Sequence, residues 1–160
     1  MASRIVNTAA GEARGGVQLS TFFIADFFFG VDVLRVQEVL RAQPMTRVPQ
    51  APEVIEGLIN LRGQIVTAID MRRRLKLAPR PADAAPMNMV IRTEDGAVSL
   101  LVDEIGDVLD VDSAAWERAP ENLDAQVRDL IRGVYKLDGR LLLVLDTEKA
   151  AEIAMTASAS

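Results

Sequence analysis

Short apolar runs alternate with turn-forming residues along most of this chain. The runs are rich in Val, Ile, Leu and Phe, have the length of β-strands, and are separated by Gly, Pro, Asp or Asn. None of them is followed by the amphipathic helix of about 10–15 residues that a βαβ unit requires. The pattern therefore predicts a mainly β, mostly antiparallel protein with strands at 22–29, 30–36, 57–59, 64–70, 87–92, 98–102, 133–137 and 140–145.

Helical spacing of apolar residues is confined to a few short segments. In the clearest one, Val127, Leu130 and Ile131 share one face and Asp124 can cap the first turn. In another, Met71 would face inward. The predicted helices are 70–77, 124–132 and 146–155, and the proline-rich stretch 80–86 is the predicted linker.

An internal repeat is the most informative structural feature of the sequence. Residues 57–70 align with residues 133–146, and each copy predicts a strand, a tight turn closed by glycine and a second strand. A weaker similarity relates 33–40 to 102–109. Although any two β-hairpins share some pattern, two matches in the same chain order favour two small barrels that share an interface. The identical pairs are Gly57/Gly133, Leu61/Leu137, Gly63/Gly139 and Asp70/Asp146.

All five phenylalanines lie within residues 22–29. They put most of the aromatic ring area on one strand pair, and strand alternation places Phe23, Phe27 and Phe29 on one face and Phe22 and Phe28 on the other. One set is expected to pack in the core. The other set, if exposed, would form an apolar edge suited to a partner.

Length and charge restrict the possible partners. A chain of 160 residues, 49% of them hydrophobic, can bury a substantial core, but its net charge of −5 disfavours nucleic acid and anionic membranes. No apolar run approaches the roughly 18 residues that cross a bilayer, and the N-terminus has no signal-peptide pattern. We therefore expect a cytoplasmic protein without direct membrane insertion. The basic cluster of Arg72–Arg74 and Lys76 is expected to be a solvated helix face, or alternatively a contact for an acidic partner.

Histidine and cysteine are both absent. Their absence excludes Ser/His and Cys/His nucleophiles, Cys/His zinc sites and disulfides. The acidic stretch 102–112 suggests a twelve-residue calcium loop that begins at Asp110 and ends at Glu121. This loop fails at its fifth and sixth positions, Ala114 and Ala115, where a ligand oxygen and a glycine are needed. No phosphate-binding glycine loop is present, so neither a metal nor a cofactor is expected. Asp103, Glu104 and Asp107 leave open a carboxylate-dependent hydrolase, which would require a deep cleft around them.

The strongest local signal is the tetrapeptide Asn60-Leu61-Arg62-Gly63. At a hairpin tip, Gly63 can adopt the positive φ that the turn requires, and the side chain of Asn60 can hydrogen-bond back to the turn. Arg62 would then project from a rigid platform. Glu38 lies on an otherwise apolar segment and is the natural partner of Arg62, although an exposed pair contributes only about 0–1 kcal/mol to stability.

Five segments, together with this motif, carry a family resemblance: 29–39, 46–49, 57–63, 69–72 and 101–103. They closely resemble the chemotaxis coupling (adaptor) protein family CheW, and the resemblance extends from about Phe22 to Ala151. It implies two interlocked five-stranded SH3-like β-barrels with a few short helices. It also implies a domain at 21–151, with a first barrel near 30–85 and a second formed by 20–29 and 87–151. Residues 1–20 and 152–160 are expected to be tails.

The same resemblance implies a function. Proteins of this family are non-catalytic adaptors that couple methyl-accepting chemoreceptors to the regulatory domain of the histidine kinase CheA, in membrane-associated arrays. The receptor tip would bind an apolar groove between the barrels, and the kinase would meet an end of the first barrel. A coupling protein of a non-chemotaxis chemosensory pathway is the alternative. The implied receptor-binding residues are Val33, Val36, Glu38, Gly57, Asn60, Arg62, Val102 and Val108, with Gly63 and Gly139 as turn residues.

Overall fold

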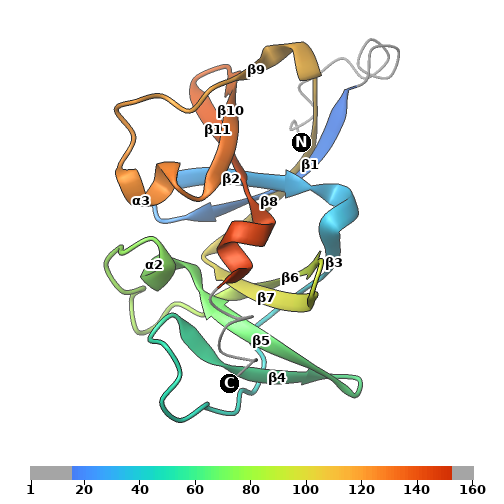
Figure 1. The fold of residues 1–160 in the computed structure, drawn as a ribbon, viewed down its shortest axis with the longest axis vertical. Coiled ribbons are helices and arrows are strands. Elements are labelled where there is room, and N and C mark those ends of the chain that lie inside the picture. Colours follow the sequence, from blue (N-terminus) through green and yellow to red (C-terminus); the bar gives the residue numbers. More distant parts are fainter. Residues whose placement is uncertain (1–15, 153–160) are drawn as a thin grey trace.

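Two β-sheets account for most of residues 16–152, the part of the chain that this computed structural model describes (Figure 1). One sheet has six strands in the order β8-β1-β2-β11-β10-β9, and the other has five in the order β3-β6-β7-β5-β4. Each sheet curls into a barrel, and Figure 1 shows the six-stranded barrel above the five-stranded one. The prediction of a mainly β protein with two barrels and few helices is confirmed.

Most strands follow the predicted apolar runs, but 30–36 is not one strand, because β2 ends at Asp32 and β3 begins at Val36. The six-stranded barrel contains β1 (Val17–Ile24), β2 (Phe27–Asp32), β8 (Glu104–Val111), β9 (Trp116–Glu117), β10 (Ile131–Leu137) and β11 (Arg140–Leu145). The five-stranded barrel contains β3 (Val36–Leu40), β4 (Ile55–Leu61), β5 (Gln64–Asp70), β6 (Met87–Thr93) and β7 (Gly96–Val102). The short helices are η1 (Val33–Arg35), α2 (Met71–Arg74), η2 (Ser113–Ala115) and α3 (Ala125–Arg128).

The two barrels exchange strands, but their boundary differs from the predicted one. The chain enters the six-stranded barrel with β1 and β2, builds the whole five-stranded barrel with β3–β7, and then returns. Residues 87–102 therefore belong to the five-stranded barrel, which is the predicted first barrel, because β6 pairs with β3 and β7 pairs in parallel with β5. Residues 17–20 lie in β1 and are not part of a tail. Residues 1–15 and 153–160 lie outside the described part.

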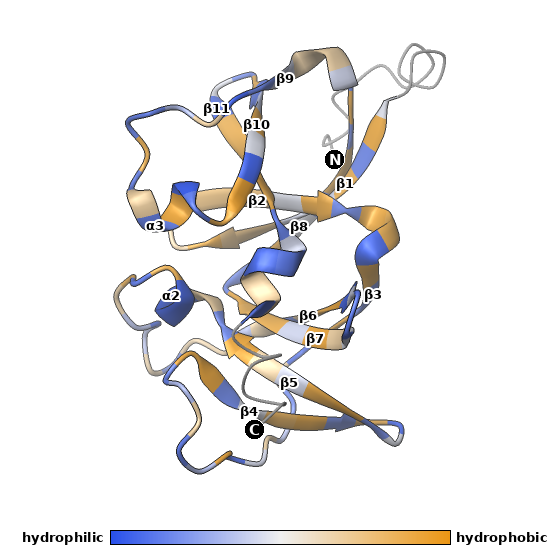
Figure 2. Cartoon of the chain, in the orientation of Figure 1, coloured by the Kyte–Doolittle hydropathy of each residue, from blue (hydrophilic) through white to orange (hydrophobic). Residues whose placement is uncertain are grey.

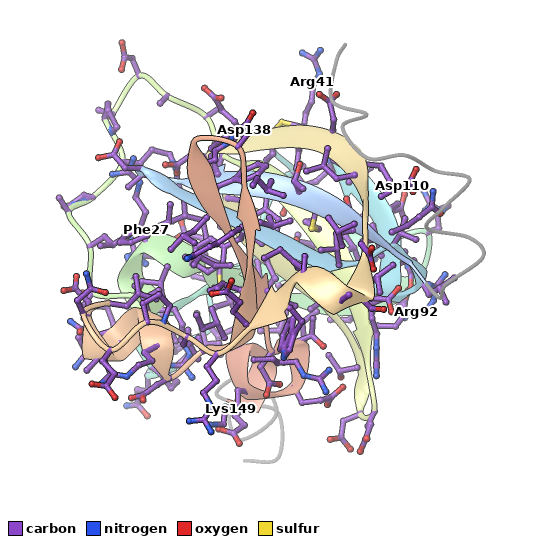
Figure 3. All side chains as sticks on the ribbon, turned by 90° about the horizontal axis from the view of Figure 1, so that it is seen from above. Phe27, Arg41, Arg92, Asp110, Asp138 and Lys149 are labelled. Carbon is purple, nitrogen blue, oxygen red and sulfur yellow. The ribbon has the colours of Figure 1, made fainter. Side chains whose placement is uncertain are left out.

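The internal repeat corresponds to a structural duplication. In both sheets an edge strand is followed by a hairpin and then by a second hairpin, so that β3-β6-β7-β5-β4 matches β8-β1-β2-β11-β10. The repeated sequences form β4–β5 and β10–β11, and the second strand of each hairpin makes the parallel pairing of its sheet. The predicted equivalence of these hairpins is confirmed. Figure 3, seen from above, shows Asp138 at the tip of β10–β11.

Each barrel has a small apolar cluster of its own, and one larger cluster, the shared core, extends through both barrels. It joins Phe22 and Phe29 of the six-stranded barrel with Ile69, Met71 and Met89 of the five-stranded one, all fully buried. Apolar surface drives association in proportion to the area removed from water, and each barrel alone would leave much of this surface exposed. Sharing the core therefore stabilises both barrels together.

The phenylalanine cluster is divided by a turn, which corrects the predicted faces. The segment is a hairpin, with β1 and β2 joined at Ala25 and Asp26, so alternation restarts after the turn. Phe22 stacks on Phe29 in the shared core, with ring centroids 5.6 Å apart. Phe23 stacks on Phe28 in a second cluster, with ring centroids 4.9 Å apart. The guanidinium carbon of Arg140 lies 4.0 Å from the centroid of the Phe28 ring.

The helices predicted at 70–77 and 124–132 are shorter in the structure. In α3, Val127 is buried as expected, but Asp124 makes no side-chain capping bond and the chain enters β10 at Ile131. In α2, the Asp70 carboxylate accepts hydrogen bonds from the first-turn N–H groups. Residues 147–152 form a helix between the two barrels, with Ala150 and Ala151 fully buried (Figure 1). Within 16–152, no helix is long and apolar enough to cross a membrane.

Candidate functional site: a hairpin tip and an edge strand

The tip of the β4–β5 hairpin is a tight turn formed by Arg62 and Gly63. Both have positive φ, 52° and 90°, as a two-residue type I′ turn requires. The N–H of Gly63 donates to Oδ1 of Asn60 at 2.9 Å, which is the hydrogen bond within the turn that the sequence predicts. Gly139 has φ 85° at the equivalent position of β10–β11.

Arg62 and Glu38 form an ion pair across the open side of the five-stranded barrel. Nη2 of Arg62 donates to Oε2 of Glu38, and Gln37 Nε2 donates to Gln64 Oε1 at 3.3 Å beside it. The hydrogen bond from Arg62 lowers the pKa of Glu38, and the carboxylate raises the pKa of Arg62, so both groups are charged at neutral pH. Because β3 and β4 are opposite edges of the sheet, this pair joins the two edges at one end of the barrel.

Three of the predicted apolar residues lie on or next to two edge strands, β3 and β8. Val33 and Val36 are half-buried on η1 and β3, beside Leu34, which is 79% exposed. Val108 is 43% exposed on β8, the equivalent edge strand of the other barrel. The structure thus brings Glu38, Asn60 and Arg62 to one end of the first barrel. It places Val33 just before β3 and Val36 at its start, and it places Val108 on β8, the corresponding edge strand of the six-stranded barrel.

Two of the predicted receptor-binding residues are buried. Val102 ends β7 inside the shared core and has no exposed surface, so it cannot contact a partner. Gly57 is buried where β4 passes the segment at Thr46, whose N–H donates to the carbonyl of Leu58 at 2.9 Å. A Cβ atom at Gly57 would lie 2.7 Å from the Thr46 carbonyl oxygen. Both positions therefore have packing roles.

Replacing Gly57 with alanine is expected to destabilise the protein. The obstructing atom belongs to the backbone, so either β4 or the segment at Thr46 must move. Overpacking of this kind costs about 1–3 kcal/mol, and urea unfolding followed by circular dichroism measures it. Gly106→Ala compares this backbone obstruction with a side-chain obstruction, because at Gly106 the atom nearest to an added Cβ is the side-chain oxygen of Thr21. An unchanged midpoint for Gly57→Ala would contradict the packing role.

The acidic residues proposed for a hydrolase do not share one cleft. Asp103 and Glu104 line a cavity of about 460 Å³ with Arg72 and Arg80, but Asp107 is not part of its lining. Burial alone would raise the pKa of Asp103, but hydrogen bonds from Arg72, the Ala25 N–H and Arg80 outweigh it and lower that pKa. Asp103 therefore remains ionised and fully engaged, and cannot serve as a proton donor near neutral pH. In the described residues, no cluster of three or more acidic side chains could hold a metal ion.

The basic cluster is only partly solvated: Arg73 and Lys76 are exposed as expected, whereas Arg72 and Arg74 are half-buried and bound within the protein. Arg72 pairs with Asp103, and Arg73 pairs with Glu56 at 3.0 Å. Arg74 donates to the carbonyl of Lys149 at 3.1 Å, which attaches α2 to the C-terminal helix. Figure 2 shows α2 as strongly hydrophilic, and these contacts explain how such a segment packs between barrels.

The lowered pKa of Asp103 predicts an acid-dependent contribution to stability. The contribution is fully present above the pKa of a free aspartate, about 3.9, and is lost as the pH falls through the lower pKa of the folded state. Asp103→Asn is therefore expected to be less stable than the wild type at about pH 7, with a difference that shrinks toward about pH 2. Urea melts across this range measure it. The other carboxylates are common to both proteins, so a difference independent of pH would contradict this assignment.

Comparison with known proteins identifies the family. The family model described as "CheW-like domain" matches residues 18–154, which is most of the chain. The chain belongs to the CheW-like family. A relative named "Probable chemotaxis protein CheW" from Rhizobium etli is 31% identical over 135 residues, covering 84% of this chain and 87% of the relative. "Chemotaxis protein CheW" from Bacillus subtilis is also 31% identical over 135 residues, covering 84% and 86%.

A solved CheW structure has the same fold. The crystal structure titled "scaffolding protein TtCheW" from Thermoanaerobacter tengcongensis has a TM-score of 0.77 with this chain at 26% sequence identity. The alignment covers 86% of this chain and 93% of the other. The CheW-like fold is thus retained across nearly the whole described structure.

Proposed function

We propose that this protein is a non-catalytic adaptor that couples methyl-accepting chemoreceptors to a CheA-type histidine kinase in chemotaxis. The observation that carries the proposal is the CheW-like match over residues 18–154, combined with relatives named as chemotaxis proteins and a scaffolding protein. The shared core supports it physically, because two barrels packed on one core present stiff surfaces. An adaptor needs such surfaces and no reactive group.

The receptor's cytoplasmic tip would contact the exposed residues at the two edge strands. Glu38, Asn60 and Arg62 supply the polar part, and the valines of η1, β3 and β8 supply the apolar part. Arginine is favoured at the energetic centres of interfaces, and the Arg62 side chain is 71% exposed. The kinase regulatory domain would bind an end of the first barrel. In the cell, the protein would be cytoplasmic and recruited to membrane-associated arrays through the receptor.

Reconstitution with both partners tests this function. The purified protein is mixed with a CheA-type kinase and receptor-containing membranes, which are then sedimented and assayed for kinase activity. We expect the kinase to sediment with the membranes and to respond to receptor ligand only when this protein is present. Failure of the wild-type protein to bind either partner would contradict the proposal.

A further inference from the structure

A single residue, Asp103, stands where the chain crosses from one barrel to the other. β7 ends at Val102 and β8 begins at Glu104, so Asp103 alone connects the two strands. Its backbone N–H donates to the carbonyl of Phe23 at 2.9 Å. This bond ties the crossover to β1 of the six-stranded barrel.

The Asp103 carboxylate joins segments from both barrels. Arg72 of α2 donates through Nε at 3.1 Å and through Nη2 at 2.7 Å, and Arg80 donates through Nε at 3.0 Å. From the six-stranded barrel, the N–H of Ala25 in the β1–β2 turn donates to Oδ2 at 2.7 Å. We call the side chains of Asp103, Arg72 and Arg80 the Asp103 clamp.

The clamp is largely shielded from water and fixed at several points. The side chains of Arg72, Arg80 and Asp103 are 16%, 11% and 15% exposed. Arg72 also donates through Nη1 to the carbonyl of Ala78 at 3.0 Å, so its guanidinium is held on two sides. Bidentate pairs between arginine and carboxylate are strong and geometrically specific, unlike an exposed pair.

The shared core and the clamp contribute different properties to the junction. The hydrophobic effect holds the barrels together in proportion to the apolar area that they bury, and this force is itself non-directional. The hydrogen bonds of the clamp have fixed lengths and angles, and they act at the crossover between β7 and β8. They therefore restrict how one barrel can rotate on the other.

We propose that the Asp103 clamp is a positioning device that fixes the angle between the barrels, so that receptor and kinase can engage one adaptor molecule simultaneously. Its consequence for coupling rests on the proposed function, whereas its geometry does not. Two linked contacts reinforce one another only when the geometry permits both at once. A loosened clamp would leave each separate contact intact and weaken the joint assembly.

The geometric part is tested by a distance measurement that needs no partner. The chain has no cysteine, so Ile65→Cys on β5 and Lys136→Cys on β10 place spin labels on the two barrels without background labelling. Ile65 is 59% exposed and the Lys136 side chain 67% exposed, so both tolerate a label. Pulsed dipolar spectroscopy then gives the distribution of distances between the barrels.

Asp103→Asn is the principal variant, and Asp107→Asn is its matched control. Asparagine has the size of aspartate and can still accept from Ala25, but it removes the carboxylate that pairs with both arginines and leaves Arg80 with Asp70 alone, at 3.8 Å. We expect its distance distribution to become about twice as wide or to split, because packed units switch between discrete arrangements. Asp107 is exposed on β8 and outside the clamp, so its variant should retain the wild-type distribution.

Two milder variants keep the test decisive if Asp103→Asn does not fold. Arg80→Ala removes one of the two arginines of the clamp, and Arg72→Lys keeps the charge but loses the bidentate geometry. Both should broaden the distribution to an intermediate extent. Wild-type distributions in every folded clamp variant would overturn the proposal.

The functional part is tested with the reconstituted assembly. Clamp variants should bind the isolated kinase domain, or receptor membranes alone, within about threefold of wild type, while receptor-controlled kinase activity falls roughly tenfold or more. Unchanged activity despite a broadened distribution would overturn the role in coupling. If the wild-type protein bound neither partner, the proposed function would fail while the distance result would still stand.

Discussion

Receptor-controlled kinase activity is expected to fall more than about tenfold when Arg62 is replaced by alanine, while the urea midpoint barely moves. Arg62 lies at a turn whose backbone is held by Gly63 and Asn60, and its own side chain is 71% exposed. An exposed ion pair contributes at most about 1 kcal/mol to folding. At the centre of a protein interface, truncation of an arginine can cost about 2 kcal/mol or more. Co-sedimentation and a urea melt of the same variant measure the two quantities.

Glu38→Ala should have a similar effect, because the Glu38 carboxylate holds the Arg62 guanidinium in place. If the two side chains act as one unit, the double variant will lose less binding free energy than the sum of the single variants. Gln64→Ala is the control, since Gln64 lies in the adjacent bond to Gln37 but carries no charge. Unfolding of Arg62→Ala would make Arg62 a structural residue that closes the barrel. Intact coupling in that variant would remove it from the site.

The repeated hairpins could be predicted because their signals are local. A glycine between two apolar runs specifies a tight turn, and the matching spacing in 57–70 and 133–146 revealed the duplication. The barrel boundary was not predictable in the same way, because it depends on the parallel pairing of β5 with β7. That pairing joins strands separated by α2, the proline-rich loop and β6. No local pattern specifies it.

The candidate site shows the same distinction. Asn60, Gly63 and the Glu38–Arg62 pair were predicted, because turn chemistry and a lone carboxylate on an apolar segment are visible in the sequence. The sequence does not reveal that Val102 is buried, because an apolar residue at a strand end has the same pattern whether it faces a groove or the core. The Asp103 clamp was not recognised as a junction, because its arginines lie in segments distant from Asp103 in the sequence. The only sequence signals were an aspartate directly after the apolar run 98–102 and the run of arginines on α2.

Phe29→Ala is expected to cause the largest loss of stability, about 3–5 kcal/mol, because it leaves a large cavity in the shared core. Phe29 is fully buried and stacks on Phe22, so the surrounding strands cannot collapse onto the space without moving both barrels. The free energy of unfolding of native proteins is about 5–15 kcal/mol, so this loss removes a large fraction of the total stability. Phe23→Ala is the comparison, since Phe23 is only partly buried and belongs to the second cluster.

The shared core also predicts how this variant unfolds. Trp116, the single tryptophan, lies on β9 and reports on the six-stranded barrel, whereas circular dichroism reports on both barrels. Because Phe29 packs in a cluster that includes residues of both barrels, the two probes should shift to lower urea together and retain coincident transitions. Phe23→Ala should shift them by a smaller amount. Separate transitions in Phe29→Ala would show that the barrels fold independently, and the cooperative role of the shared core would then be wrong.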